Sequence, residues 1–393
     1  MHKKFRTSKK SAVPQSSNGP YELYRSLPNP VYGSSLPANP AARMRGPKRS
    51  LKQKLKKAAV STAIAIGVVL VVTGGYLGYK FWRDFGWSNI ASLFDRTRLK
   101  GEDVGRVNVL LAGYSADDPG HAGADLTDSI MLVSIDTRTD KAFMLSIPRD
   151  LYVNIPGNGY AKINETYEDG QADHFDVSGY PTGGMGLLEQ VVSQNFNVPI
   201  DYYALIDYTA FRDAVNAVGG ITINIQSPDP RGLYDPNTNL NLPNGEVTLN
   251  GQSALNLARA RGDGYGSYGF PQADFNRTAH QRQMLVAIAA KATSAGVLAN
   301  PIKVGELFDA LSKNVQTDFS VADGRRLNTI MKKIPQSRIA SAALNSANYN
   351  GRKGVDLLQS YETYSGEDAL VPAAGLTNYT QIDAYVSQLE TEN

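Results

Sequence analysis

The chain has 393 residues, of which 42% are apolar, so it can bury the core of one large domain or of two ordinary ones. It contains no cysteine, which excludes disulfides, thiolate metal sites and cysteine nucleophiles. Residues 1–58 carry fourteen Lys and Arg against one acid, Glu22, a local charge of +13. The net charge of +3 therefore hides a mildly acidic remainder of −10.

The N-terminal segment predicts a membrane anchor. Residues 1–57 are polar and basic without apolar periodicity, which is typical of a disordered tail. Residues 58–79 carry no charge and as a helix would span about 33 Å, enough to cross a bilayer. The basic run that precedes them predicts a cytoplasmic N-terminus, with the tail held at the anionic inner leaflet rather than on nucleic acid. A cleaved signal peptide fits worse, because the basic leader is long and no small-x-small site closes the apolar run.

We therefore divide the chain into a disordered basic cytoplasmic tail (1–57), a single-pass transmembrane helix (58–79), a stalk (80–103) and an extracellular domain (104–393). The localisation predicted from this order is the cell membrane, with the main domain outside the cell.

From residue 104 onward the pattern is that of a folded α/β domain. Nearly continuous apolar runs predict strands buried on both faces, at 107–114, 129–136 and 142–147, and a further strand at 221–225. Helices are expected at 185–196, 209–218, 251–260 and 275–296. Strands separated by helices predict a three-layer α/β/α sandwich with a mostly buried central sheet.

Four arginines are concentrated in LARARGDGYGSYGFPQADFNRTAHQRQ, residues 257–283. On a helix capped by Asp274, the side chains of Asp274, Arg277 and Gln281 share one face, and His280 lies beside them. A guanidinium group offers a planar fork of donors that matches phosphate oxygens bidentately. The stretch therefore predicts a phosphate or pyrophosphate site at a helix N-terminus.

The same stretch has a second interpretation. Arg259 and Arg261 end the preceding helix, and the Gly/Tyr loop lets the two helices converge, while Arg282 points away. Surface salt bridges from Arg259 and Arg277 to Asp263 and Asp274 would explain the pattern equally well.

A second cluster follows two of the predicted strands. Arg149 and Asp150 stand at the C-terminal end of a buried strand, where open α/β sheets bind ligands. Asp128 opens the neighbouring strand and is either a salt-bridge partner or a Mg²⁺ ligand, since Mg²⁺ needs only one or two protein carboxylates beside substrate phosphates. Lys162 and Asn164 add a cation and an amide nearby.

Other residues leave two interpretations open. Asp117, next to Asp118, is a second metal carboxylate or part of a turn. Tyr114 and Tyr208 line the site or belong to the core. The histidines lack zinc spacing, and no G-x-S-x-G, Walker A or G-x-G-x-x-G motif occurs, which argues against a serine hydrolase, an ATPase and a dehydrogenase.

The segments that carry these residues together resemble the LytR–CpsA–Psr family. The resemblance rests on an ordered set of motifs: NVLLAGYS, TDSIMLVSID, SIPRDLYVNIPG, AKINETY, LARAR, DFNRTAHQRQ and the C-terminal LVPAAGLTNYTQIDAYV. It implies a cell-envelope enzyme that uses Mg²⁺, with Mn²⁺ as the alternative. Such an enzyme transfers a phosphorylated glycopolymer (teichoic acid, capsular polysaccharide or an arabinogalactan-like chain) from a polyprenyl-pyrophosphate carrier to a hydroxyl of peptidoglycan.

The motif match also implies roles for single residues. Asp128 would hold the metal on the pyrophosphate, and Asp274 and Gln281 would orient the arginines or activate the acceptor hydroxyl. The pyrophosphate oxygens would be clamped by four arginines: Arg149, Arg259, Arg261 and Arg277. The substrate-binding set is completed by Asp150, Lys162, Asn164 and His280.

The chain departs from the family pattern where an arginine is often found, at Leu126 and His280, and where an acidic residue is usual, at Ser115. Either the substrate carries less charge than usual, or Lys162 and the tyrosines of the Gly/Tyr loop compensate. Two other activities stay open: a polyprenyl-pyrophosphate hydrolase that uses the same site, and a non-catalytic envelope protein that binds anionic polymer or lipid.

Overall fold

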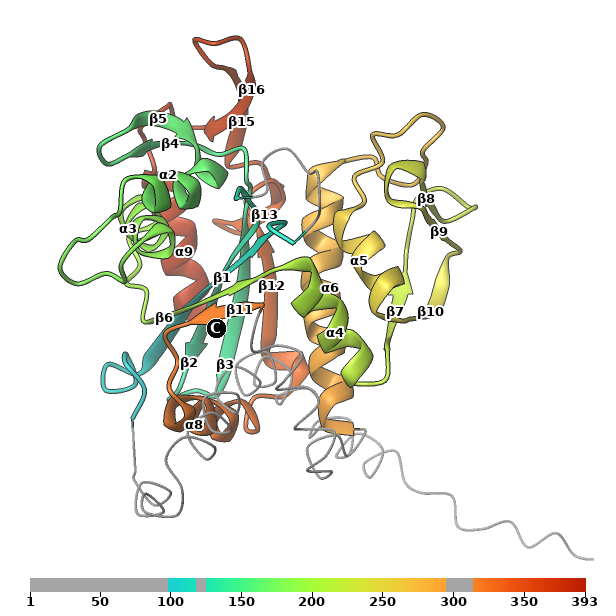
Figure 1. The fold of residues 1–393 in the computed structure, drawn as a ribbon, viewed down its shortest axis with the longest axis horizontal. Coiled ribbons are helices and arrows are strands. Elements are labelled where there is room, and N and C mark those ends of the chain that lie inside the picture. The colour runs from blue at the N-terminus through green and yellow to red at the C-terminus, as the bar shows by residue number, and fades with distance from the viewer. Residues whose placement is uncertain (1–97, 118–124, 295–313) are drawn as a thin grey trace, which may run out of the picture. The chain divides into compact units, whose positions relative to one another are not determined.

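The computed structural model describes residues 98–117, 125–294 and 314–393 (Figure 1). Within these ranges no helix is long and apolar enough to cross a membrane. The predicted tail, the transmembrane helix at 58–79 and most of the stalk lie outside the described residues.

The described part of the domain is built on a mixed sheet of six strands in the order β11-β6-β1-β2-β3-β12. β1 pairs antiparallel with β2 and parallel with β6, and β3 pairs antiparallel with β2 and parallel with β12. The strands are β1 (Arg106–Tyr114), β2 (Thr127–Asp136), β3 (Lys141–Ile147), β6 (Tyr202–Ile206), β11 (Val315–Thr317) and β12 (Ile339–Ala343).

Both faces of this sheet are buried, as the continuous apolar runs predict. Leu110, Leu132 and Leu145 face one core, which also contains side chains of α3 and α9. Val109 and Val133 face a second core with residues of α8. A mostly buried central sheet between helices confirms the predicted α/β class (Figure 1).

The helices agree closely with the sequence pattern. Asp207 caps α4 by accepting a hydrogen bond from the backbone N–H of Ala210 at 2.7 Å, and Gly219 and Gly220 follow its end with positive φ. The described α-helices are α2 (Thr166–Ala172), α3 (Gly184–Phe196), α4 (Tyr208–Ala217), α5 (Gly251–Arg259), α6 (Asp274–Ser294), α8 (Val321–Met331) and α9 (Thr380–Glu392). Short 3-10 helices are η2 (Ile163–Glu165), η3 (Pro236–Thr238) and η5 (Gln336–Arg338).

A further cluster of apolar side chains joins α4, α5 and α6 to the strand pair β7 (Ile221–Ile225) and β10 (Gly245–Leu249). The three isoleucines of β7 all lie on its buried face, and Thr222 and Asn224 alternate with them on the exposed face, which is the pattern of a one-sided strand. This cluster places α5 and α6 beside the sheet (Figure 1).

Four more hairpins extend the domain: β4 (Tyr152–Ile155) with β5 (Gly159–Lys162), β8 (Leu233–Asp235) with β9 (Leu240–Leu242), β13 (Ala347–Tyr349) with β14 (Arg352–Val355), and β15 (Leu358–Glu362) with β16 (Asp368–Pro372). The sequence pattern did not predict them, because strands of three to five residues are too short for a clear alternation.

Candidate functional site

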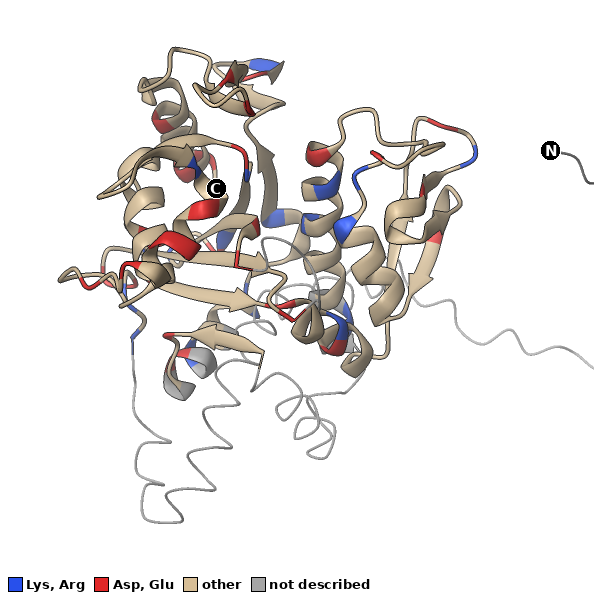
Figure 2. Ribbon diagram, turned by 45° about the horizontal axis from the view of Figure 1, so that its top comes forward, with Lys and Arg blue, Asp and Glu red and all other residues tan. Residues whose placement is uncertain are grey.

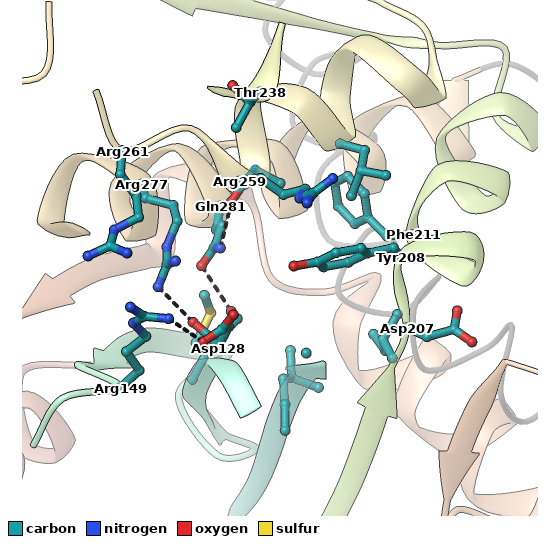
Figure 3. Close-up of a pocket in the computed structure, with 18 of the residues that line it drawn as sticks. Asp128, Arg149, Asp207, Tyr208, Phe211, Thr238, Arg259, Arg261, Arg277 and Gln281 are labelled. Atoms are coloured by element: carbon teal, nitrogen blue, oxygen red, sulfur yellow. Dashed lines mark hydrogen bonds and ion pairs between the residues drawn. The ribbon is translucent and has the colours of Figure 1, made fainter. Parts of the chain in front are cut away.

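A cavity of about 300 Å³ lies between the sheet and the helices α4, α5 and α6 (Figure 3). Figure 3 shows Arg149, Arg261 and Arg277 on one side of it and Tyr208 and Phe211 on the other. The polar lining includes Asp128, Ser129, Arg149, Asn237, Thr238, Arg259, Arg261, Asp263, Arg277 and Gln281. The apolar lining includes Leu111, Ala112, Met131, Ile206, Phe211, Leu255, Ala258 and Leu285.

A β-bulge directs Asp128 toward this cavity. Gly113 pairs with Ser129, but the next residue, Tyr114, pairs with Thr127, so Asp128 is left out of the register. A bulge bends the strand and turns the extra side chain, and bulges are common beside active sites. The regular alternation of β2 therefore does not decide where the Asp128 carboxylate points.

Antiparallel pairing brings Arg149 to Asp128. The start of β2 lies beside the end of β3, with Ile130 opposite Ile147. Asp128, two residues before Ile130, and Arg149, two residues after Ile147, therefore meet at one sheet edge. The Arg149 guanidinium donates to the Asp128 carboxylate at 2.5 Å and lies 3.6 Å from that of Asp150. Burial opposes the charge of Arg149, but these two carboxylates outweigh it and raise the pKa of the guanidinium.

Arg277 is the most enclosed of the cavity arginines, with 4% of its surface exposed. Its Nη2 lies 2.7 Å from the Asp274 carboxylate one helical turn earlier and donates to the backbone carbonyl of Asp128 at 2.8 Å. Burial lowers the pKa of this guanidinium, and the nearby Asp274 opposes that effect. Arg277 therefore ties the start of α6 to the bulge of β2.

Arg259 and Arg261 reach the cavity from the end of α5. The Nε of Arg261 lies 3.5 Å from Asp274, and its Nη1 lies 3.8 Å from Asp263. The guanidinium of Arg259 lies 4.8 Å from the centre of the Tyr208 ring, a cation–π contact. In Figure 3, Arg149, Arg261 and Arg277 converge above Asp128, while Arg259 extends toward Tyr208.

Both interpretations of the basic stretch therefore hold in part. Ion pairs exist, yet the buried Nε atoms of Arg149, Arg261 and Arg277 have no hydrogen-bond partner within the described residues. A buried donor without a partner loses free energy, so three such donors at one cavity favour an anion that accepts from them. We call Arg149, Arg259, Arg261 and Arg277 the arginine clamp.

Gln281 links three elements behind the clamp. Its side-chain oxygen accepts from the Ser129 hydroxyl at 2.9 Å, and its amide donates to the carbonyl of Ala258 at 2.9 Å. Both polar ends of the amide are occupied, which suits a positioning residue. Ser129 was not singled out in the sequence, because a serine in a strand carries no signal of its own.

Several residues predicted for the site lie outside the cavity lining. Both oxygens of Asp117 accept from backbone N–H groups at the start of α4, those of Tyr208 and Thr209, at 3.1 and 2.7 Å. This carboxylate caps a helix, so the structure favours the turn-like role over the metal role. The ammonium group of Lys162 forms an ion pair with the Glu367 carboxylate at 3.2 Å. Glu367 therefore compensates the positive charge of Lys162, which does not add to the charge of the clamp.

Asp150 and Asn164 support the clamp from behind. Asp150 contacts the Arg149 guanidinium, as described above. The backbone N–H of Asn164 donates to the carbonyl of Arg149 at 3.2 Å, and its own carbonyl accepts from the Thr127 hydroxyl at 3.2 Å. The structure therefore places these two residues where they hold Arg149, and the cavity lining does not include them.

His280 lies inside the domain rather than in the cavity. Its ring meets Phe270 edge to face at 6.0 Å, and burial, together with the charge of Arg282, lowers its pKa to about 4. Arg282 turns the other way and donates to the hydroxyls of Ser146 and Ser341 at 2.5 and 2.7 Å. His280 is thus neutral at pH 7 and adds no charge to the clamp.

The tyrosines separate into different roles. Tyr208 lines the cavity, whereas Tyr114 packs edge to face on Tyr167 at 5.6 Å. Tyr265 is fully exposed, and Tyr268 stacks on Tyr234 at 5.4 Å. The tyrosines of the Gly/Tyr loop therefore do not replace the charge missing at Leu126 and His280.

The cavity also contains polar residues that the sequence pattern did not indicate. Asn237 and Thr238 of η3 line it, and the Asn237 amide donates to Asp263 at 3.1 Å. Asp207 lines it as well, and burial raises its pKa to about 6, but Figure 3 shows its carboxyl pointing away from the clamp.

The donor set fits a magnesium ion that is shared with a ligand. Within the described residues there is no group of three or more His, Cys, Asp or Glu side chains that could hold a metal ion alone. Asp128 is the carboxylate at the centre of the clamp, with one oxygen engaged by Arg149. One carboxylate with substrate phosphates is an arrangement that Mg²⁺ accepts.

Comparisons with known proteins identify the family of this chain. The model of the LytR_cpsA_psr family matches residues 89–367. The polyisoprenyl-teichoic acid–peptidoglycan teichoic acid transferase TagU of Oceanobacillus iheyensis is 37% identical over 225 residues, which cover 57% of this chain and 62% of the relative. TagU of Bacillus subtilis is 29% identical over 69% of this chain and 81% of its own length.

Solved structures show the same fold. The structure of the family protein YwtF (TagT) with bound octaprenyl pyrophosphate lipid has a TM-score of 0.50 and 22% identity, covering 73% of this chain and 90% of its own. The resemblance found in the sequence is confirmed, and the transferase names of the relatives confirm the predicted enzyme class for the family.

Proposed function

The chain belongs to the LytR_cpsA_psr family, and we propose that it transfers a phosphorylated glycopolymer from a polyprenyl-pyrophosphate carrier to a hydroxyl of peptidoglycan. The relatives' names supply the substrate class, teichoic acid and peptidoglycan. The site of this reaction would be the outer face of the cytoplasmic membrane, with the predicted anchor at 58–79 holding the domain there.

The observation that carries the proposal is the arginine clamp on one side of a cavity whose lining also includes apolar side chains. A polyprenyl pyrophosphate has two corresponding parts, a diphosphate head and a hydrocarbon tail. Leu111, Met131 and Phe211 offer apolar contacts to the tail. The Nε atoms of Arg149, Arg261 and Arg277, which make no hydrogen bond within the described residues, would donate to the head group. The cavity is at the small end of ligand sites, so it would hold the head group and the nearest part of the tail.

The proposed reaction requires no covalent bond between the substrate and the protein. The acceptor oxygen bonds to the phosphorus that carries the glycopolymer, and the bridging P–O bond breaks with its electron pair going to polyprenyl phosphate. The acceptor proton ends on the leaving phosphate or in solvent. Phosphoryl transfer of this kind depends mainly on positioning and charge neutralisation.

The residues divide these tasks. Arg149, Arg261 and Arg277 neutralise the charge that develops on the phosphate oxygens and hold them in line. Asp274 keeps two of these guanidinium groups together, and Gln281 fixes α6 against β2 and α5. Asp128 would hold Mg²⁺, which when bound withdraws electron density from the phosphate oxygens.

The test uses the full chain in detergent with a synthetic polyprenyl-pyrophosphoryl oligosaccharide, Mg²⁺ and short peptidoglycan strands, with products read by mass spectrometry. A phosphodiester-linked adduct is expected, and it should disappear with EDTA, with Asp128→Asn and with Arg277→Ala. Arg231→Ala is the matched control, because Arg231 is exposed and pairs with Asp229 outside the cavity.

The same experiment separates the rival activities. Polyprenyl phosphate without an adduct would identify the hydrolase. Intact donor recovered from a tight complex would identify the non-catalytic binding protein and contradict the proposed transfer. Transfer that survives Arg277→Ala would remove the clamp from the mechanism.

A further inference from the structure

Three tyrosine rings form a row on the surface beside the cavity. The ring of Tyr152 lies between those of Tyr160 and Tyr361, with centroids 5.7 and 5.6 Å away and ring planes tilted by 29° and 32°. Tyr160 is 44% exposed. The three residues come from β4, β5 and β15, so the row depends on the packing of two hairpins. We call it the tyrosine row.

The tyrosine row adjoins the arginine clamp. Tyr152 follows Arg149 by three residues, so their Cα atoms are at most about 11 Å apart. The hairpin β15–β16 is attached at the same place, where the backbone N–H of Leu370 donates to the carbonyl of Asp150 at 2.9 Å. A ligand that covers the row is therefore within the length of a few sugar rings of the clamp.

The surroundings of the row are acidic. Residues 150–176 and 358–372 contain nine Asp and Glu against one basic residue, Lys162. Glu362 and Asp368 stand directly opposite each other across β15 and β16, an arrangement of like charges that destabilises a hairpin. Figure 2 marks the acidic positions of the domain in red and the basic positions in blue.

We propose that the tyrosine row binds the acceptor of the reaction, a glycan strand of peptidoglycan, and this proposal rests on the proposed function. A pyranose ring has apolar C–H faces and polar edges, which match the apolar face and the hydroxyl of tyrosine. The acceptor hydroxyl must reach the pyrophosphate, and the row lies next to the clamp. The teichoic-acid donor is a polyanion, so the acidic surroundings repel it and leave the row to the acceptor.

A membrane surface is the competing occupant, since tyrosines also favour bilayer interfaces. The acidic side chains around the row argue against it, because they repel anionic lipid head groups. The experiment includes this alternative as an outcome.

The test measures steady-state transfer by the full chain with acceptor strands varied at fixed donor. Tyr160→Ala and Tyr361→Ala should each raise the KM for the acceptor about tenfold, equivalent to about 1.4 kcal/mol. The donor KM should stay unchanged. Tyr160→Phe keeps the stacking face and should restore the wild-type value. Tyr265→Ala is the matched control, because Tyr265 is fully exposed in the Gly/Tyr loop.

A binding measurement keeps the proposal testable without turnover. In Tyr160→Trp, the uncharged tetrasaccharide of N-acetylglucosamine, which offers the same pyranose faces without a carboxylate, should shift the new indole emission saturably. An unchanged acceptor KM in both alanine variants, with transfer still abolished by Arg277→Ala, would overturn this inference and leave the proposed function standing. A shift with phosphatidylglycerol vesicles and none with the tetrasaccharide would assign the row to the membrane and also overturn it.

Discussion

The arginine clamp and the tyrosine row are connected through the short segment from Arg149 to Tyr152 and differ in almost every physical respect. The clamp is enclosed, cationic and drawn mostly from one stretch, residues 257–283. The tyrosine row is exposed, lies in acidic surroundings and joins residues more than 190 positions apart. The difference indicates that the two sites bind different parts of the reaction, because an anionic head group needs buried donors whereas a long glycan strand needs an open surface.

The charge of the clamp also has to come from arginine alone. His280 is neutral at pH 7, and Lys162 is paired with Glu367. This explains why the contrast between the two sites should survive changes of pH in the neutral range. The following predictions test that contrast.

The largest effect is expected for Arg149→Ala. It removes two phosphate donors and leaves Asp128 without its ion-pair partner, so kcat/KM for transfer should fall about 10³-fold. Arg149→Lys should recover little, because an ammonium group lacks the bidentate fork. Arg352→Ala, an exposed arginine on β14, serves as the control. Equal activity of the alanine variant and the wild type would remove Arg149 from the clamp.

A smaller loss is expected for Asp274→Asn. The substitution keeps the shape of the side chain but removes the charge that holds Arg277 and Arg261 together, so kcat should fall about 10- to 100-fold. The matched control is Asp263→Asn, since the Asp263 side chain is half exposed and lies 3.8 Å from Arg261. Similar losses in both variants would argue against a specific positioning role for Asp274.

His280→Gln tests the neutral histidine through stability. Between pH 6.5 and about pH 4 the unfolded chain protonates this histidine while the folded chain does not, so native stability is lost as the pH falls through that range. The glutamine variant lacks this loss and should gain about 2 kcal/mol relative to wild type on going from pH 7 to pH 5. Urea unfolding at both pH values measures it, with His174→Gln, at an exposed position, as control.

Activity gives a second test of the same residue. Transfer by His280→Gln should match the wild type between pH 6 and pH 8, because neither side chain is charged there. A selective loss in the variant as the pH falls from 8 to 6 would show that a protonated His280 takes part.

The smallest effect is expected on the acidic side. Glu362→Lys replaces a repulsive cross-strand pair with an attractive one opposite Asp368, and should stabilise the domain by about 0.5 kcal/mol. Thermal unfolding at low salt measures it. Gln359→Lys adds a positive charge on the same strand opposite Val371 and is the control. An equal gain in the control would mean that net charge, and not the pairing, is responsible.

Much of the fold follows from local sequence. The runs that form β1, β2 and β3 are mostly apolar because both faces of the sheet are covered, and the cap and glycines around α4 mark its ends. The basic stretch also predicted that Arg277 and Gln281 share a helix face, which the cavity lining shows. These features depend on neighbours within a turn or a strand, so the sequence carries them directly.

Tertiary structure decided the rest. Three features depend on partners distant in the chain: the bulge at Asp128, the ion pair of Lys162 with Glu367, and the capping of α4 by Asp117. The tyrosine row depends most on such distant partners, because nothing near Tyr152 in the sequence predicts a contact with Tyr361. The sequence by itself thus determined the long buried strands, the helices that carry the arginines and the identity of the charged groups. Only the tertiary structure decided which of those groups meet, because a contact between distant residues is fixed by the packing of whole elements.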